Sequence, residues 1–151
     1  MLVRLLYASR PAQGHEPAVL DAILEQSRQH NPVHGISGIL CFSQSLFMQV
    51  LEGGRDEVCE LFNRIVRDDR HRHVRLLCYD EIRERRFANW TMGQVDIEKV
   101  NVTLLLRYAE KPQLDPYACS GRTSMRLLEE LIATADAAMY ADKRARRLQN
   151  A

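Results

Sequence analysis

Gln49 is the first residue whose type and position suggest chemistry. It lies in the run from Leu46 to Leu51, whose apolar, aromatic and β-branched content indicates a buried strand that stops at Glu52-Gly53-Gly54. A primary amide without hydrogen-bond partners inside a protein costs about 1 to 3 kcal/mol. Gln49 therefore needs a partner, and the candidates are a main-chain group, a tyrosine or a bound ligand with a polar edge.

Tyr7 is a tyrosine that could meet this amide. Side chains alternate between the two faces of a strand, so the strand-like run at residues 2–9 puts Tyr7 on its apolar face with Val3 and Leu5. The same rule groups Gln49 with the apolar side chains of its own strand. The two residues touch only if the first and third strands are neighbours in the sheet. Otherwise each is an ordinary core residue, with the amide bonded to main chain.

Two predicted helices carry further polar side chains. On the first, Ile23, Ser27 and Asn31 recur every four residues and so form one line on the helix surface. The second carries Ile65 on its apolar face and gathers basic side chains at its end, namely Arg64, Arg67, Arg70 and His71. Two such helices side by side on a sheet could hold a flat ring and an anionic extension. A helix-terminal asparagine and a solvated basic end explain the same residues without a ligand.

The sequence lacks the motifs of common enzymes. It contains no nucleophile elbow, Walker loop, dinucleotide-binding glycine pattern or zinc-protease helix. Four side chains near the end of the second helix could in principle bind a metal ion, namely Asp68, Asp69, His71 and His73. Their spacing is not typical of metal ligands, so we expect no metal site. Residue spacing alone therefore allows a ring-binding cleft, beside the explanation without a ligand, and indicates no catalysed reaction.

The elements that must position these residues follow the order β-α-β-β-α-β-β. We expect strands at residues 2–9, 36–42, 46–51, 74–79 and 90–95, and helices at 17–30 and from Asp56 to about residue 68. This order predicts an α+β, ferredoxin-like sheet with one additional strand and two helices on one face. The other face is also apolar and needs cover. We expect C-terminal helices there, at 96–110 and from about Thr123.

Length and composition are those of an ordinary globular protein. The 151 residues suffice for one core, and we expect a domain at 1–95 followed by a helical extension at 96–151. A net charge of +1 gives no overall attraction to nucleic acid or membrane. The four cysteines lack C-x-x-C spacing, which predicts reduced thiols. No run approaches the ~20 apolar residues of a membrane span, and Met1 leads directly into a strand, so we expect a cytoplasmic protein.

Five blocks of the sequence, in order, resemble the blue-light-using-flavin (BLUF) domain. They are RLLYAS at residues 4–9, HNP and GISGIL at 30–32 and 35–40, FMQVLEG at 47–53, DDRH at 68–71 and RFANWTM at 86–92. The resemblance implies the ferredoxin-like fold already predicted. It also implies an oxidised flavin held noncovalently between the two helices, FAD in most members, with FMN or riboflavin as alternatives.

The resemblance further implies roles for single residues. Tyr7 resembles the tyrosine that gives an electron and a proton to the excited flavin, and Gln49 resembles the glutamine that links this tyrosine to the ring. The residues implied to hold the cofactor are Ile23 and Ile65 above and below the ring, Asn31 at its carbonyl and imide edge, His30 beside it, and Ser27, Arg64, Arg70 and His71 near the ribityl and phosphate part. Trp90 and Met92 resemble a signal-relaying pair on the last strand, where a spacing of two puts both on one face.

We therefore expect a blue-light photoreceptor and not an enzyme. Light-driven electron and proton transfer from Tyr7 would rearrange Gln49 and give a reversible, red-shifted signalling state. That state would be passed to a partner protein by contact, and homo-oligomers are expected for so short a chain. The main alternative is a light-independent ferredoxin-like regulatory or interaction module with Tyr7 and Gln49 as core residues. A flavin-dependent enzyme would need an open substrate site that the sequence does not display.

Two features near the end of the chain remain. Residues 132–144 are similar to the terminal helix of GGDEF diguanylate cyclases, but the signature loop of that family is absent from the sequence, so we predict no cyclase activity. The basic run at 143–147 is better explained as a solvated helix end than as a contact surface, and we expect no nucleic-acid binding.

Overall fold

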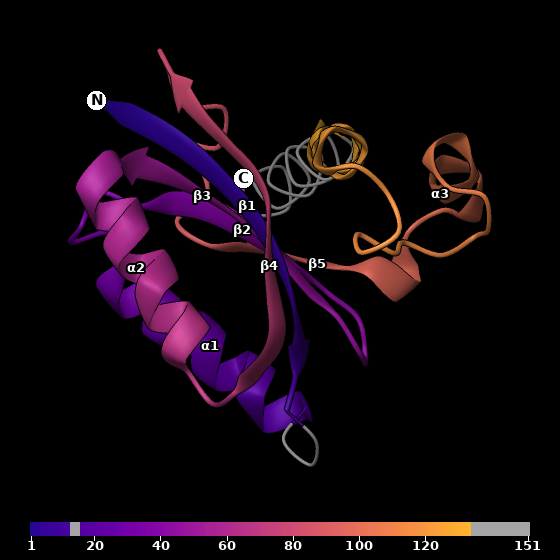
Figure 1. The fold of residues 1–151 in the computed structure, drawn as a ribbon, viewed down its shortest axis with the longest axis horizontal. Helices are drawn as coiled ribbons and strands as arrows, with labels where there is room; N and C mark the ends of the chain where they lie inside the picture. Colours follow the sequence, from indigo (N-terminus) through magenta and orange to yellow (C-terminus); the bar gives the residue numbers. More distant parts are fainter. Residues whose placement is uncertain (13–15, 134–151) are drawn as a thin grey trace, which may run out of the picture.

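The computed structural model of the chain describes residues 1–12 and 16–133 (Figure 1). In this part of the chain five strands form one sheet, in the order β4-β1-β3-β2-β5. They are β1 (Leu2–Pro11), β2 (Ser37–Phe42), β3 (Phe47–Gly54), β4 (His71–Ile82) and β5 (Gly93–Asp96). Neighbouring strands are antiparallel except β2 and β5, which are parallel. The predicted ferredoxin-like arrangement with an added strand is confirmed.

Two helices cover one face of this sheet, as predicted. α1 (Glu16–His30) and α2 (Arg55–Arg67) lie side by side on it (Figure 1). Their buried side chains pack against β1 and β3 in one cluster that includes Val19, Ile23, Val58, Leu5 and Tyr7. α1 ends at His30, as expected, because helical backbone is unfavourable at Asn31, which precedes Pro32. α2 begins at Arg55, one residue before the predicted start, and its N-cap is Gly54, which has no side chain that could cap the helix.

A helix at residues 121–133 covers the opposite face (Figure 1). Leu128 and Ile132 pack there in a cluster with strand residues such as Leu6 and Met48. The helix begins very close to β4, since a β-carbon added to Gly121 would lie 2.0 Å from the carbonyl oxygen of Leu77. Both faces of the sheet are thus covered, as the apolar character of both faces of β1 predicted.

The segment predicted as one helix at 96–110 is different. It forms a short 3-10 helix, η1 (Ile97–Lys99), and a seven-residue α-helix, α3 (Val102–Tyr108). The Asp96 side chain caps the first and the Asn101 side chain caps the second, so two N-caps divide the segment. α3 does not cover the sheet, because its buried Leu105 packs against residues 127 and 131 and the helix lies beyond 121–133 (Figure 1). This part of the prediction was wrong.

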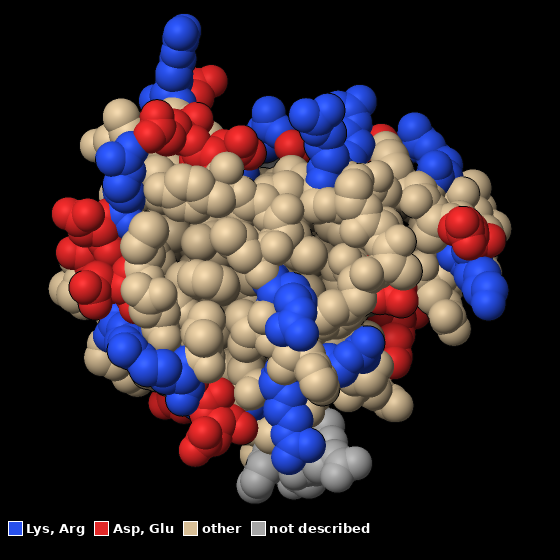
Figure 2. All heavy atoms as spheres, in the orientation of Figure 1, with Lys and Arg blue, Asp and Glu red and all other residues tan. Residues whose placement is uncertain are grey.

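β4 lies at one of the two edges of the sheet, opposite β5, and is longer than the predicted 74–79. Its pairing with β1 shifts register at two places, and His73 has a positive φ of 52°. Leu76 and Tyr79 are exposed on it. The face seen in Figure 2 is largely uncharged in its middle, with charged side chains around it.

Two further observations concern the predictions made from composition. All four cysteines are free, as expected, and burial raises the pKa of the Cys41 thiol to about 12. No helix in the described ranges is long and apolar enough to cross a membrane. Most of the segment that resembles a GGDEF helix, and the whole basic run at 143–147, lie outside the described residues.

Candidate functional site: a cavity between α1, α2 and the sheet

A cavity lies between α1, α2 and the face of the sheet formed by β1 and β3. Its wall contains every residue predicted to hold the cofactor, together with the two predicted photochemical residues: Tyr7, Ile23, Ser27, His30, Asn31, Gln49, Arg64, Ile65, Arg70 and His71. They come from five places in the sequence, and the ferredoxin-like topology brings them together. Their predicted roles toward a ligand remain proposals, but their shared location is a property of the fold.

Tyr7 and Gln49 form the centre of this site. The register of β1 and β3 makes them direct cross-strand partners, and the Tyr7 hydroxyl donates to Oε1 of Gln49 at 2.5 Å. Both side chains are almost fully buried, with exposures of 0% and 2%. Burial, assisted by the nearby negative charge of Asp68, raises the pKa of the Tyr7 phenol far above its ordinary value. Tyr7 is therefore a protonated hydrogen-bond donor over the whole physiological pH range.

The amide nitrogen of Gln49 points toward the last strand of the sheet. Its Nε2 donates to Sδ of Met92 at 3.2 Å, and a thioether is only a weak acceptor. Gln49 is thus held firmly on the tyrosine side and weakly on the methionine side. A rearrangement of this amide therefore gives up only a weak contact on its nitrogen side.

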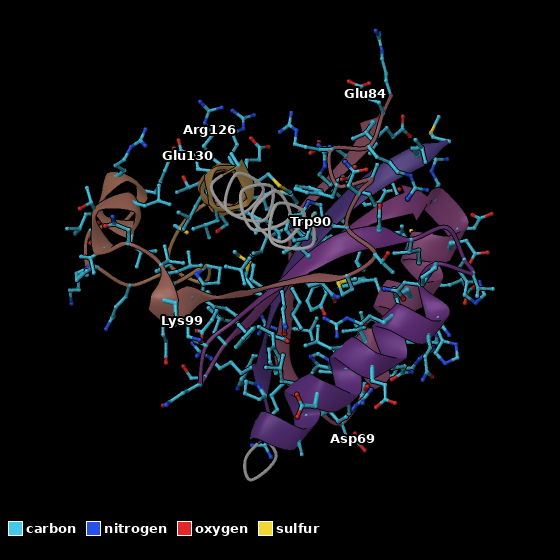
Figure 3. The ribbon with its side chains drawn as sticks, turned by 180° about the vertical axis from the view of Figure 1, so that it is seen from behind. Asp69, Glu84, Trp90, Lys99, Arg126 and Glu130 are labelled. Atoms are coloured by element: carbon cyan, nitrogen blue, oxygen red, sulfur yellow. The ribbon has the colours of Figure 1, made fainter. Side chains whose placement is uncertain are left out.

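Trp90 and Met92 do not share a face, which corrects the prediction from their spacing. β5 begins only at Gly93, so alternation along a strand does not apply to Trp90. Met92 joins the cluster of Tyr7, whereas Trp90 joins the cluster on the other side of the sheet, away from α1 (Figure 3). The Trp90 ring lies against Gly93, where an added β-carbon would be 2.0 Å from it. Met92 is therefore the residue next to Gln49.

His71 lies beside Tyr7 and completes one wall. Its ring meets the Tyr7 ring edge-on at 6.3 Å between centroids, and its Nδ1 lies 2.8 Å from Oγ of Ser9. Burial lowers the pKa of His71 below its ordinary value, while the neighbouring Asp68 opposes this shift. The imidazole is therefore neutral at pH 7 and fixed by its contact with Ser9.

Asn31 provides the clearest sign that the cavity is built for a ligand. The residue is 3% exposed and lines the cavity, yet its Nδ2 has no hydrogen-bond partner among the described residues. Its main chain is fixed at both ends, because its N–H donates to Ser27 and its carbonyl accepts from Ile36. A buried donor without an acceptor costs about 1 to 3 kcal/mol. An acceptor on a bound molecule would remove that cost.

The two predicted phosphate-side arginines differ in their surroundings. The Arg70 guanidinium donates to both carboxylate oxygens of Asp68 and to Oε1 of Gln26, which joins the end of α2 to α1. The hydrogen bonds from Arg70 lower the pKa of the Asp68 carboxyl, so this pair is charged at neutral pH. Arg64 makes no hydrogen bond or ion pair within the described part of the chain. Arg64 is consequently the cation still available to an anionic ligand.

The sequence analysis missed five residues that also line the cavity, namely Gln26, His34, Ile36, Leu61 and Asp68. Helical spacing could have identified three of them. Gln26 lies three residues after Ile23, and Leu61 and Asp68 lie on the Ile65 face of α2 or just past its end. His34 and Ile36 lie outside both helices, where no periodicity indicates their direction.

Comparison with known proteins agrees with this geometry. A sequence model of the BLUF family, described as sensors of blue-light using FAD, matches residues 2–93. The chain belongs to the BLUF family. The match covers every residue that lines the cavity and ends at the first residue of β5. The family resemblance predicted from five sequence blocks is thereby confirmed.

Curated relatives contain this BLUF segment within longer proteins. Subunit beta of the photoactivated adenylate cyclase of Euglena gracilis is 33% identical over 92 residues, which is 60% of this chain and 11% of that protein. The blue light- and temperature-regulated antirepressor BluF of Escherichia coli (strain K12) is 29% identical over 97 residues, or 64% of this chain and 24% of that protein. The matched segment therefore spans a quarter or less of these relatives.

Solved structures extend the likeness beyond the sheet. BlsA in its photo-activated state has a TM-score of 0.78 at 33% identity and covers 87% of this chain and 94% of that one. The dark state of the BLUF protein BlrB has a TM-score of 0.73 at 33% identity, with 89% and 96% covered. BlrP1 of Klebsiella pneumoniae, solved with FMN and cyclic diGMP, has a TM-score of 0.63 at 36% identity, with 68% and 28% covered. The BLUF fold of this chain is thus supported independently of its sequence match.

Proposed function

We propose that this BLUF chain is a blue-light receptor that holds a flavin in the cavity between α1 and α2. The observation that carries the proposal is the unpaired Nδ2 of buried Asn31, which lines the same cavity as the Tyr7–Gln49 pair. A flavin ring has carbonyl acceptors for that donor and flat apolar faces for the isoleucines on the two helices. The cavity therefore fits the cofactor that the family description names.

The remaining lining residues suit the other parts of the cofactor. Ile23 and Ile65 would contact the ring, and His30 and Ser27 would lie beside it and its ribityl chain. Arg64 would meet a phosphate, because Arg70 is already bonded to Asp68. We propose FAD, since the family is described by it, with FMN and riboflavin sharing the same ring.

The photochemical role follows from the Tyr7–Gln49 contact. A bound flavin supplies a chromophore that, after absorbing blue light, accepts an electron and a proton from a neighbouring donor. Tyr7 is that donor, because its buried phenol is protonated and bonded to Gln49 Oε1. Once both the electron and the proton have returned to Tyr7, the Gln49 amide would be left in a rotated or tautomeric arrangement, with no net oxidation or reduction. Its donor and acceptor then face the cavity differently, which changes the flavin hydrogen bonds and shifts its absorption to the red.

The output is a change in protein contacts, not a chemical product. The Gln49 amide also bonds to Met92, so its rearrangement alters that contact at the start of β5. We infer that residues 1–95 sense light and that 96–151 transmit it to a partner protein, in the cytoplasm and with self-association into oligomers. The chain would act as a sensor and not as an enzyme.

One preparation tests this proposal. The protein is purified in the dark, its absorption is recorded before and after blue light, and its extracted cofactor is identified by mass. We expect a yellow protein with a reversible red shift. A colourless protein that cannot be reconstituted with FAD, FMN or riboflavin would contradict the proposal. Bleaching to a reduced flavin during turnover would favour the flavin-enzyme alternative instead.

A further inference from the structure

Glu52 is a fully buried carboxylate on the same strand as Gln49. It lies three residues further along β3, so its side chain points to the opposite face of the sheet. Its exposure is 0%, and it accepts hydrogen bonds from the main-chain N–H groups of Arg86 and Phe87 and from the Arg4 guanidinium. A buried carboxylate is stable only when it is well bonded, so these contacts fix residues 86 and 87 to β3.

Arg85 strengthens the same attachment. Its guanidinium donates to the carbonyls of Gly35 and Glu52 and to the hydroxyl of Ser37. The chain just before residue 86 is therefore bonded to the end of β3 and to the start of β2. Both strands are interior to the sheet, which makes this a rigid point of attachment.

From this attachment the chain runs across the helix at 121–133. The Arg86 side chain forms an ion pair with Glu129 of that helix. Phe87 and Trp90 are buried in the cluster that contains Leu128 and Ile132. The segment 86–92 is thus joined to the helix by an ion pair and by a shared apolar cluster, while its last residue, Met92, contacts the Gln49 amide.

Both ends of this segment are therefore held by one strand, from opposite faces. The Glu52 end is held by strong, charge-assisted bonds, and the Met92 end by a weak bond to the amide proposed to rearrange. The Trp90 carbonyl in the middle also accepts from the Gly38 N–H of β2, so a change at the Met92 end falls on the Trp90 side chain and not on a shift of the main chain. If the first end were loose, the whole segment would shift and its middle would move less against the helix.

We propose that Glu52 is a positioning residue that anchors residues 86–87, so that a change at the Gln49–Met92 contact displaces Trp90 against the helix at 121–133. This proposal rests on the function proposed above. It assigns to Glu52 a role in passing the signal across the sheet and none in binding or exciting the flavin.

The test compares the full-length, flavin-loaded protein with its Glu52→Gln variant. Glutamine keeps the size of the side chain but removes its charge and replaces Oε2 by an NH2 group, so the bonds from Arg4 and from Arg86 to Oε2 are lost. Only a neutral Oε1 is left to accept from the N–H groups of residues 86 and 87, which weakens the anchor. The readout is the light-minus-dark difference in hydrogen exchange of peptides covering 121–133, divided by the fraction of flavin that is red-shifted. We expect the variant to keep the red shift and to lose at least two thirds of the exchange difference.

Glu84→Gln is the matched control. It makes the same charge change in an exposed side chain that projects away from the body of the protein (Figure 3). It should leave both readouts as in the wild type. Arg85→Ala loosens the same anchor at a half-buried residue without touching the buried carboxylate, and it should also reduce the exchange difference. If Glu52→Gln does not fold, the exchange difference of Arg85→Ala alone tests the anchor proposal.

The outcomes separate the two proposals. Absence of a red shift in the wild type would count against the proposed function. A normal red shift with no exchange difference at 121–133 in the wild type would overturn the anchor proposal alone. The anchor proposal would also be overturned if Glu52→Gln and Arg85→Ala kept a normal red shift and an undiminished exchange difference at 121–133.

Discussion

Tyr7 and Gln49 are direct cross-strand partners in β1 and β3, and the phenol donates to Oε1 of the amide at 2.5 Å. Each of these strands has a neighbour on both sides, so the backbone that carries the pair is held in the interior of the sheet. The freedom at this site therefore belongs to the Gln49 side chain, whose other contact is the weak bond to Met92.

Tyr7→Phe should keep the flavin and lose the normal reversible red shift. The substitution removes the hydroxyl that donates to Gln49 but keeps the ring that packs against Phe62. Absorption spectra before and after blue light provide the measurement. Tyr79→Phe, at an exposed position on β4, is the matched control and should shift normally. A red shift unchanged in the Tyr7 variant would rule out the assigned donor.

Gln49→Leu should also bind flavin without the normal shift. Leucine fills a similar volume in the buried strand but can neither accept from Tyr7 nor donate to Met92. The same spectra test this, with Gln44→Leu in the exposed turn between β2 and β3 as control. If the Gln49 variant showed a wild-type shift, the rearranging group would have to be sought elsewhere.

Asn31→Ala should weaken flavin binding by roughly tenfold, which corresponds to about 1.4 kcal/mol and is a usual contribution of one hydrogen bond. The expected cause is loss of the Nδ2 donor that has no partner among the described residues. Titration of the flavin-free protein with FMN and riboflavin, followed by fluorescence, gives the affinities. Asn63→Ala, on the exposed side of α2, should bind as the wild type does. Equal affinities for the two variants would remove the main support for the ligand site.

Gly121→Ala should destabilise the protein by about 1 to 3 kcal/mol, a usual cost of overpacking. The added β-carbon would lie 2.0 Å from the Leu77 carbonyl oxygen, so the helix at 121–133 would have to move away from β4. Thermal unfolding should show a lower midpoint by several degrees. Gly54→Ala meets no atom within 4 Å and should change the midpoint little. Equal midpoints for the two variants would show that the helix is not seated against β4.

Acidification should destabilise the fold through His71. Burial lowers its pKa below the ordinary value of 6.5, so the unfolded chain takes up this proton first as the pH falls. Its contribution to the free energy of unfolding is complete above pH 6.5 and declines below that value until the folded pKa is passed. The lowered pKa of Asp68 acts only in a more acidic range, below its ordinary 3.8. Urea unfolding at pH 7.5 and 5.5 should show a smaller loss of stability in His71→Asn than in the wild type.

The faces of Tyr7 and Gln49 could be predicted because their strands are regular. Alternation gives the face of each side chain, whereas the pairing of their two strands was left open and is given by the observed strand order. The line of Ile23, Ser27 and Asn31 was equally predictable from helical spacing. The cavity between these elements therefore follows from local rules and one topology.

Trp90 could not be placed in the same way. Its face depends on tertiary contacts, because its carbonyl accepts from the Gly38 N–H and its ring packs against Gly93 before the strand begins. The division of 96–110 was more accessible, since Asp96 and Asn101 are both good N-cap residues five positions apart. The continuous apolar spacing of that segment concealed the two caps.

The irregular edge strand also affects how the protein behaves at high concentration. A twelve-residue strand with one open side can serve as a template for edge-to-edge aggregation. The two register shifts of β4 and the left-handed backbone of His73 interrupt the row of N–H and C=O groups that a strand from another molecule would need. Such a strand could pair with only a short stretch of β4, so this edge protects the protein against fibril-like assembly.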